Sequence, residues 1–391
     1  MRVLMVSKLW PPRAVGGAER YAHRLAAHLE AAGHEVGVVT YGVEGDGVVA
    51  AVPTHGVDPE RWWTASAFVR RRSHVVDLWN PSARRVLGRA IEEFRPDVVH
   101  SHAVAGMSVA ALLTDAPRVH TVHDLWLTCW RGYPIRDGEV CSSTCAVCLP
   151  YLWSRRSLVQ RRPPVFVTPA DAVRRAHADK GWDTTSWRVI RHALDLPAEQ
   201  APRRRPDPAA LRVGFIGQVS REKGVDLLLD AVPVLPPSTR VVVAGDGVLD
   251  EQVRGHPQVE HRGRVGGDEK ERFFADIDVL VVPSRVPEVA PLVLDEAAVR
   301  GVPIIGARRG GIPEYVPAPC QPLLFDPDRP ADLGASLQRF ASDPDRFVVE
   351  PPVDRTWSDH VSQILAAYGD AVGAAQVMVG RRSRGRALRA R

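Results

Sequence analysis

Short apolar runs with the length of buried β-strands recur along this chain, and each is followed by a segment with helical spacing. Before position 197 the runs include VLMVS (3–7), VGVVT (36–40), DVVHSH (97–102) and VFVTP (165–169). After position 210 they include LRVGFIG (211–217), VVVAGDG (241–247) and VLVVP (279–283). Regular alternation of strands and helices is typical of parallel sheets covered by helices. The sequence therefore predicts an α/β fold.

The alternating pattern occurs twice, and an irregular stretch separates the two series. At 391 residues the chain is too long for one hydrophobic core and fits two domains. The segment PAEQAPRRRPDPAA (197–210) is rich in proline and charge, without periodicity, and is expected to be a linker. We expect domains at 1–197 and 211–356. A helix at about 357–378 closes the fold, and 379–391 is a basic, irregular tail.

Composition places the chain among ordinary globular proteins. It is 45% hydrophobic and 25% charged, and no apolar run approaches the roughly 20 residues that span a bilayer. The N-terminal MRVLMVSKLWPP is expected to be a first strand and not a signal peptide, which predicts a cytoplasmic protein. The net charge of +5 is modest, so no nucleic-acid partner is expected. Much of the excess lies in RRSRGRALRAR (381–391), for which a weak membrane-surface contact is the alternative to a solvated end.

Two glutamates follow the strand VLVVP, separated by seven residues. Glu288 lies on the expected loop and Glu296 in the expected helix, which begins near Pro291 and continues through Leu292. Ligands of open α/β sheets bind outside the carboxyl ends of the strands, and a helix N-terminus there favours anions. Carboxylates only accept hydrogen bonds, so each of the two can hold the hydroxyl groups of a sugar.

Three further groups lie in equivalent turns after strands. Gly16 and Gly17 precede the first helix and let the backbone approach a ligand closely, although glycines there are often only part of a turn. Lys223 follows the first strand of the second half and can stabilise a negative leaving group. His123 ends the strand VHTVH, with Asp124 after it as either a cap or an acceptor contact.

Four cysteines gather in the segment after His123. Cys129, Cys141, Cys145 and Cys148 have the spacing C-x11-C-x3-C-x2-C. In a cytosolic chain such a cluster more often binds metal than forms disulfides. We expect a structural zinc or an iron–sulfur cluster, with reduced thiols and disulfides as the alternatives.

Taken together, these segments resemble the retaining glycosyltransferases of family 4, which have the GT-B fold of two Rossmann-like domains facing across a cleft. In the second half the motifs are GFIGQVSREKG (214–224), VVVAGDG, VEHRGRV (259–265), VLVVPS (279–284) and GVPIIGARRGGIPEYV (301–316). In the first half they are VLMVSKLWPPRAVGGAERYAHRLAAHLEAAGHEVGVVT (3–40), DVVHSH and VHTVHDLW (119–126). The resemblance covers nearly the whole chain and is weakest over 45–85 and the last dozen residues.

The resemblance implies a nucleotide-sugar donor and assigns roles to individual residues. Glu296 matches the family glutamate that binds the ribose, and Glu288 the one beside the donor sugar. Lys223 is implied at the diphosphate, and His123 at the transferred sugar or the acceptor hydroxyl. The implied catalytic residues are His123, Glu288 and Lys223. The implied donor-binding residues are Gly16, Gly17, Arg221, Lys223, Arg264, Val265, Glu288, Pro291, Leu292 and Glu296.

This chain departs from the family pattern at two places. The family usually has an arginine after the first glycine of the diphosphate loop, where this chain has Gln218, and Arg221 is the expected substitute. Many members have Phe-Gly between the two glutamates, where this chain has Ala290 and Pro291. Proline is tolerated in the first turn of a helix, so the helix start is expected to survive.

The implied reaction is sugar transfer to a hydroxyl acceptor with retained configuration, by front-face attack and with no cofactor required for catalysis. The excess of arginine over lysine indicates a high-GC coding sequence, and on that ground an antibiotic or other natural product is the first acceptor hypothesis. Cell-envelope polysaccharide or glycolipid is the second. A GT-B pseudo-transferase, an epimerase and a nucleotide-sugar-binding protein are alternatives. A nucleotide-binding oxidoreductase would require the G-x-G-x-x-G pattern, which is absent from the first strand–helix turn.

Overall fold

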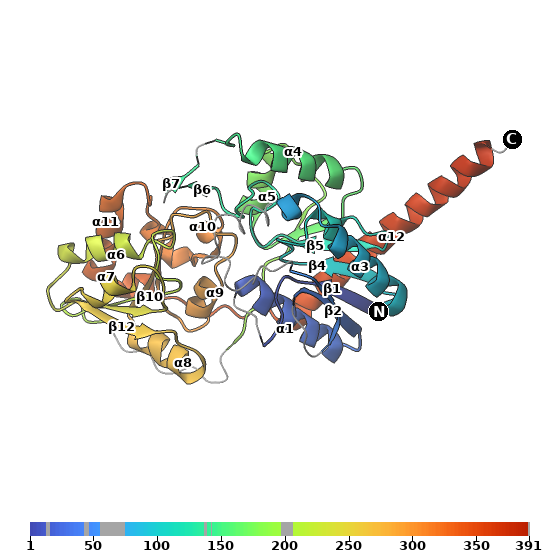
Figure 1. Cartoon of the computed structure of the whole chain (residues 1–391). Coiled ribbons are helices and arrows are strands. Elements are labelled where there is room, and N and C mark those ends of the chain that lie inside the picture. Colours follow the sequence, from blue (N-terminus) through green and yellow to red (C-terminus); the bar gives the residue numbers. More distant parts are fainter. Residues whose placement is uncertain are drawn as a thin grey trace. The chain divides into compact units, whose positions relative to one another are not determined.

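The structure is a computed structural model that describes residues 1–12, 16–42, 47–54, 75–136, 139–141, 143–196 and 206–389 (Figure 1). Side chains are described up to Val377. The chain forms two compact units. The first contains Met1–Tyr133, Ser143–Ala193 and Trp357–Arg391, and the second contains Pro134–Ser142 and Leu194–Thr356.

The first unit is built on a seven-stranded parallel sheet with the order β3-β2-β1-β4-β5-β8-β9. Its strands are β1 (Arg2–Val6), β2 (Glu35–Tyr41), β3 (Val48–Val52), β4 (Val98–Ser101), β5 (Arg118–Thr121), β8 (Val165–Thr168) and β9 (Arg188–Val189). The helices are α1 (Gly17–Ala31), α3 (Pro81–Phe94), α4 (Cys148–Val159), α5 (Asp171–Ala178) and α12 (Trp357–Arg389). A 3-10 helix spans Val109–Leu112. The central strands are apolar because both faces of a parallel sheet are covered.

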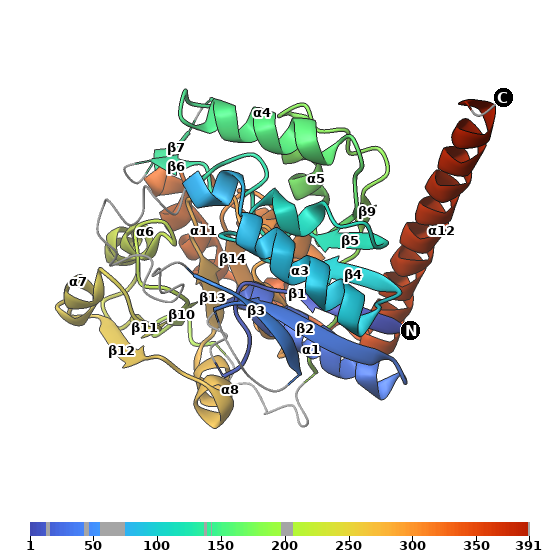
Figure 2. The same cartoon turned by 45° about the vertical axis from the view of Figure 1, so that its right-hand side comes forward.

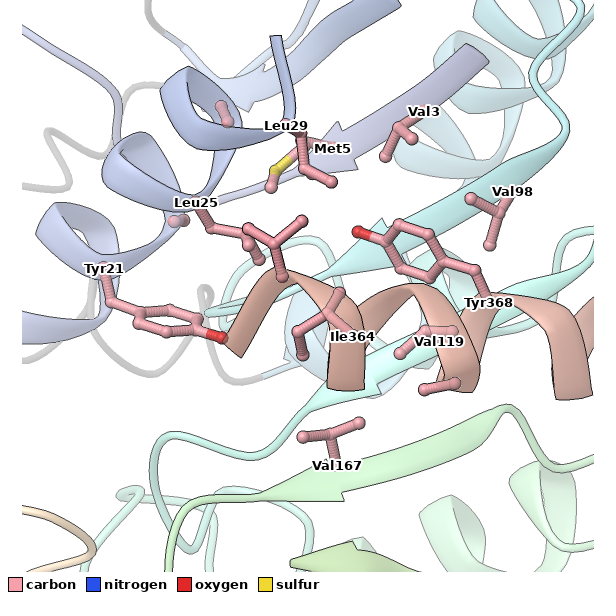
Figure 3. Packing of buried hydrophobic residues seen from close by; sticks show 14 of the residues in the cluster. Val3, Met5, Tyr21, Leu25, Leu29, Val98, Val119, Val167, Ile364 and Tyr368 are labelled. Carbon is pink, nitrogen blue, oxygen red and sulfur yellow. The ribbon is translucent and has the colours of Figure 1, made fainter. Parts of the chain in front are cut away.

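Helix α12 completes the core of the first unit, although it lies at the other end of the sequence. Ile364 and Tyr368 are fully buried against residues of β1, α1 and β4, as Figure 3 shows. Two buried hydrogen bonds accompany this packing: Tyr368 Oη lies 2.8 Å from His100 Nδ1, and Tyr21 Oη lies 2.8 Å from His360 Nε2. The last part of α12 projects from the first unit (Figures 1 and 2).

The second unit contains a five-stranded parallel sheet with the order β12-β11-β10-β13-β14. Its strands are β10 (Arg212–Ile216), β11 (Arg240–Ala244), β12 (Val259–Gly263), β13 (Val279–Val282) and β14 (Ile304–Gly306). The helices are α6 (Val225–Ala231), α7 (Asp250–Arg254), α8 (Gly267–Asp276), α9 (Leu292–Ala298), α10 (Ile312–Tyr315) and α11 (Pro330–Ser342). Short 3-10 turns span Val232–Val234, Ala318–Leu323 and Pro344–Phe347. Two parallel sheets with intervening helices confirm the predicted α/β fold.

Several details differ from the sequence-based expectations. The backbone expected to be an irregular tail is helical up to Arg389, as a continuation of α12. The side chains of that segment lie outside the described residues, and so does most of the linker 197–210. The strand β3 was not predicted, and neither was the hairpin of β6 (Ile135–Arg136) and β7 (Glu139–Val140), which groups with the second unit. Within the described residues no helix has the length and apolar character to cross a bilayer.

Replacing Ile364 by alanine should destabilise the first unit, because the fully buried side chain would leave a cavity beneath the sheet. We expect the free energy of unfolding to fall by about 2–5 kcal/mol. All ten tryptophans lie in the sequence ranges of the first unit, so urea unfolding followed by tryptophan fluorescence reports this unit selectively. The exposed neighbour Gln363→Ala is the matched control and should change stability by less than about 0.5 kcal/mol. Equal midpoints for the two variants would contradict the role of α12 in the core.

Candidate active site

A lysine and a glutamate meet at the carboxyl edge of the second sheet. Lys223 follows β10 and Glu288 follows β13, and these two strands are parallel neighbours, so their loops leave the same edge. Lys223 Nζ donates to Glu288 Oε1 at 2.5 Å, and Ser284 Oγ donates to the same oxygen at 2.8 Å. The Glu288 side chain is only 9% exposed and that of Lys223 is 33% exposed. The carboxylate is therefore held in one position, while the ammonium group keeps access to solvent.

Two glycines allow the loops around this pair to approach one another. Gly224 has φ +74°, and a Cβ on it would lie 1.9 Å from the carbonyl oxygen of Pro283. Gly310 has φ +57°, and a Cβ on it would lie 2.3 Å from the carbonyl oxygen of Glu288. Gly311 N–H donates to that same carbonyl at 2.7 Å. Positive φ and close backbone contact together require glycine at positions 224 and 310.

Glu296 lies on α9 and has a different partner. Its Oε1 accepts from Lys270 Nζ at 2.8 Å, and both side chains are about one quarter exposed, at 24% and 25%. The helix begins at Leu292, with Pro291 in an extended conformation immediately before it, which agrees with the expected helix start. Lys270 was not predicted from the sequence, because nothing in the sequence of α8 distinguishes this lysine from a solvated one.

The other predicted donor-binding residues of the second unit lie at its surface. The Arg221 side chain is 68% exposed and its Nε lies 3.6 Å from Asp226 Oδ2. Asp226 also accepts from Arg285 Nη1 at 2.6 Å. The Arg264 side chain is 76% exposed and its Nε donates to Asp246 at 2.8 Å, and Val265 beside it is half-buried. Arg221 is thus directed to Asp226 in the described contacts, and not to the Lys223–Glu288 pair.

His123 lies in a group of aromatic side chains in the first unit. It follows β5, and its Nε2 lies 3.1 Å from Nδ1 of His102. The rings of Tyr21 and His192 have centroids 5.2 Å and 5.9 Å from the His123 ring. Burial of the ring is the main reason that the pKa of His123 lies well below its usual value, and the neighbouring His102 is the second reason. The imidazole is therefore neutral at pH 7, so it offers hydrogen-bonding atoms and no positive charge.

A buried ion pair fixes the segment after His123. Asp77 accepts from Arg155 Nη2, Trp126 Nε1 and Gly106 N–H, each at 2.6 Å. Arg155 is fully buried and its guanidinium lies 3.9 Å from the centre of the Trp126 ring. The backbone N–H of Trp126 donates to Asp124 Oδ1 at 2.8 Å, and burial raises the pKa of Asp124 to about 6. Asp77 and Arg155 were not predicted from the sequence, because Asp77 lies where the resemblance is weakest and Arg155 lies in a run typical of a surface helix.

Gly16 and Gly17 stand at the start of α1, as predicted. Gly17 is the first residue of the helix, and Gly16 precedes it in an extended conformation. A Cβ on Gly16 would lie 2.4 Å from Glu19 Oε2, so the missing side chain leaves room for this buried carboxylate. The role of the two glycines at the donor diphosphate stays a prediction, and residues 13–15 before them lie outside the described residues.

The structure brings two of the four clustered cysteines together. Cys129 and Cys148 are buried with their Sγ atoms 3.8 Å apart, and the neighbouring Cys129 thiol is the main cause that raises the pKa of Cys148. Cys141 and Cys145 are half-buried, and none of the four cysteines is joined in a disulfide. Among the described residues no three His, Cys, Asp or Glu side chains are arranged to hold a metal. The metal site therefore stays a prediction, and it requires Cys141 and Cys145 to join the buried pair.

Metal content of the native chain tests that prediction. We expect protein purified without a histidine tag to contain about one zinc per chain, or iron with sulfide, because four thiolates suit either centre. Elemental analysis and a thiol titration measure this directly. A folded, metal-free preparation with four reactive thiols in this segment would rule the centre out.

Buried histidines should make the first unit sensitive to acid. Burial lowers the pKa of His120 to about 3 and those of His177 and His360 to about 4, and holds those of His100 and His102 well below the usual value. These groups stay neutral in the folded chain and take up protons in the unfolded chain below pH 6.5. Stability is therefore present above that pH and falls as the pH drops, by about 1.4 kcal/mol per pH unit for each such histidine. Urea unfolding followed by tryptophan fluorescence at pH 7.5, 6.5 and 5.5 measures the slope, and a constant midpoint would contradict it.

Models of known families match both halves of the chain. The model described as Glycosyltransferase Family 4 matches residues 15–197, and the model described as Glycosyl transferases group 1 matches residues 210–343. Together these ranges include every residue of the two candidate sites.

Individual proteins give the same result. A glycogen synthase of Mycobacterium tuberculosis is 28% identical over 88% of this chain and 87% of its own length. A D-inositol 3-phosphate glycosyltransferase of Mycolicibacterium gilvum is 26% identical over 71% of this chain and 66% of its own length. Among solved structures, Anabaena HepE in complex with UDP aligns with a TM-score of 0.63 at 18% identity, covering 98% of this chain and 100% of its own. The starch synthase IV catalytic domain of Arabidopsis thaliana, bound to ADP and acarbose, aligns with a TM-score of 0.65 at 15% identity, over 95% and 99%. The chain belongs to glycosyltransferase family 4 and is a nucleotide-sugar glycosyltransferase with the two Rossmann-like halves of the GT-B fold.

Proposed function

We propose that this chain transfers a sugar from a nucleoside diphosphate donor to a hydroxyl acceptor with retention of the anomeric configuration. The observation that carries the proposal is the Lys223–Glu288 pair at the carboxyl edge of the second sheet. A cation and a fixed carboxylate at this edge suit the diphosphate and the sugar of such a donor. The ammonium group neutralises diphosphate, and the carboxylate accepts hydrogen bonds from sugar hydroxyls.

Lys223 is assigned to the departing diphosphate. Charge develops on the leaving phosphate oxygen as the glycosidic bond breaks, and a cation already in place stabilises that charge. Lys223 is one third exposed, so a phosphate group can reach its ammonium without unfolding the loop. Backbone amides and cations are proposed to replace a divalent metal, so transfer should continue in the presence of EDTA.

Glu288 and Glu296 are assigned to the donor hydroxyls. Glu288 is held by Lys223 and Ser284, and its backbone carbonyl is held by Gly311, so its carboxylate presents a fixed acceptor to the sugar. Glu296 is tethered by Lys270 and is assigned to the ribose. Neighbouring structures with UDP, or with ADP, support a nucleoside diphosphate as the donor part and leave its base open.

His123 is assigned to the reacting sugar or the acceptor hydroxyl. Because its imidazole is neutral, it can orient a hydroxyl through a hydrogen bond without titrating near pH 7. In the proposed front-face reaction the departing phosphate oxygen takes the acceptor's proton. No side chain then needs to form a covalent bond to the sugar.

The proposed acceptor class is supported by the names of the relatives and not by the candidate site. They include a glycogen synthase, a D-inositol 3-phosphate glycosyltransferase and a sulfoquinovosyl transferase. These names favour a saccharide, a polyol or a glycolipid of the cell envelope as the acceptor. We place an antibiotic or other natural-product core second.

Two substitutions should separate donor binding from transfer. Glu296→Gln should weaken nucleoside diphosphate affinity by roughly 1–3 kcal/mol, the usual effect of losing a charged hydrogen bond. His123→Ala should leave that affinity unchanged and lower the transfer rate by roughly 10²-fold, the contribution of one positioned polar group. Calorimetry with UDP, ADP, GDP and dTDP measures affinity, and NMR of the product measures the anomeric configuration.

The matched control is Glu251→Gln, an exposed carboxylate of α7. It should keep full affinity. Unchanged affinity in Glu296→Gln would remove the ribose assignment, and normal transfer by His123→Ala would return this histidine to a structural role. An inverted product would overturn retention while leaving the family assignment intact.

A further inference from the structure

A buried histidine is hydrogen-bonded to His123. His102 follows β4 and His123 follows β5, and these parallel strands are neighbours, so both rings lie at the same edge of the first sheet. Nδ1 of His102 lies 3.1 Å from Nε2 of His123. His102 is only 1% exposed, whereas His123 is half-buried. The hydrogen bond therefore joins a residue of the candidate site to a group with almost no exposed surface.

Packing holds the ring of His102 in place. The centre of the His100 ring lies 4.2 Å from the centre of the His102 ring, and that of the Tyr21 ring lies 5.8 Å away. His100 is itself held at both nitrogens, because its Nδ1 lies 2.8 Å from Tyr368 Oη and its Nε2 lies 2.8 Å from Thr121 Oγ1. The ring of His102 therefore has little freedom to rotate.

The hydrogen bond between the two rings contains one proton, and the position of that proton determines what His123 can do. Burial is the main reason that the pKa values of both rings lie well below the usual value, so each ring is neutral and carries a proton on one nitrogen. If Nδ1 of His102 carries the shared proton, Nε2 of His123 accepts, and His123 is protonated at Nδ1. The reverse arrangement would leave Nδ1 of His123 unprotonated, and His123 would be a base there.

The second nitrogen of His102 favours the first arrangement. In the part of the chain that the structure describes, Nε2 of His102 is buried without a hydrogen-bond partner. A buried N–H without an acceptor is rarer in proteins than a buried acceptor without a donor. His177 follows this rule, because its Nδ1–H donates to the carbonyl of Val173 at 2.8 Å and its buried, unpartnered Nε2 is the unprotonated nitrogen. The proton of His102 is therefore assigned to Nδ1.

We propose that His102 is a positioning residue for sugar transfer, whose Nδ1–H holds His123 in the tautomer protonated at Nδ1. His123 then offers an N–H donor to a hydroxyl oxygen of the reacting sugar or of the acceptor. Within the described ranges nothing accepts from Nδ1 of His123, so this N–H is available to a ligand. The lone pair on Nε2 is already engaged by His102, so His123 takes no proton.

This role rests on the proposed function, in which His123 contacts the reacting sugar or the acceptor hydroxyl. It agrees with the front-face reaction proposed above, because the departing phosphate oxygen, and not a side chain, takes the acceptor's proton. His102 touches neither ligand, and it acts only through the tautomer and the orientation of His123.

NMR of the wild-type chain labelled with ¹⁵N-histidine reads the tautomer directly. Protonated and unprotonated ring nitrogens have well-separated shifts, and the signals of His123 among the fourteen histidines are identified by their loss in His123→Ala. His123 should be protonated at Nδ1 in the wild type at neutral pH. In His102→Leu it should populate both tautomers, because nothing then selects one of them.

Two substitutions of His102 separate the hydrogen bond from the packing. His102→Leu removes the donor and should lower the transfer rate about tenfold, the effect of one lost hydrogen bond. The affinity for the nucleoside diphosphate that the wild type binds should not change, because that ligand is assigned to the second unit. His102→Asn places an amide N–H where Nδ1 of the imidazole stood, and it should restore most of the rate and the wild-type tautomer of His123.

The matched control is His177→Leu. His177 is also a fully buried histidine of the first unit, and it lies outside the candidate sites. This variant makes the same change of side chain and should lower the melting temperature, while the transfer rate and the His123 shifts stay as in the wild type. All variants are compared at a temperature well below their melting transitions, so that the measured rates belong to folded chains.

Three results would overturn the role of His102. They are a wild-type His123 protonated at Nε2, a His102→Leu variant that transfers as fast as the wild type, and a His102→Asn variant as slow as His102→Leu. Each of them leaves the proposed function standing when His123→Ala is impaired in transfer. Normal transfer by His123→Ala would instead remove the proposed role of His123, and the role of His102 with it.

Discussion

The first unit depends on a helix that comes from a remote part of the sequence. Together with α1, helix α12 covers one face of the parallel sheet, with Ile364 and Tyr368 fully buried. The hydrogen bonds from Tyr368 to His100 and from His360 to Tyr21 specify the position of the helix as well as its burial. Buried polar groups must be paired, so the correct placement of α12 satisfies several of them at once. The second unit has no such requirement within its own sheet, which is formed from one uninterrupted stretch of sequence.

Both candidate sites are supported by polar groups with little exposure to water. In the second unit Glu288 is fixed by Lys223, Ser284 and the backbone of Gly311. In the first unit Asp77 and Arg155 fix Trp126, and Trp126 fixes Asp124 beside His123. A buried ion pair contributes little net stability compared with apolar packing, but removing one partner leaves an uncompensated charge. Such pairs therefore specify loop geometry more than they raise stability.

Sequence reasoning found the groups that lie immediately after strands, because the topology of a parallel sheet places all strand ends on one edge. Lys223, Glu288 and His123 were found in this way. It did not find Asp77, Arg155, Lys270 or the pairing of Asp295 with Arg355, whose guanidinium donates to both carboxylate oxygens at 2.5 and 3.2 Å. In these three pairs the two partners lie between 26 and 78 positions apart in the sequence. No local sequence pattern around either partner predicts the contact.

The sequence by itself determined the α/β class and the division into two halves, because the periodicity of apolar residues is a local property. Only the tertiary structure decided which charges pair and which histidines stay neutral. Pairing and burial depend on distances between remote segments, and the physical reason is that the cost of desolvating a group is set by its neighbours in space and not by its neighbours in sequence.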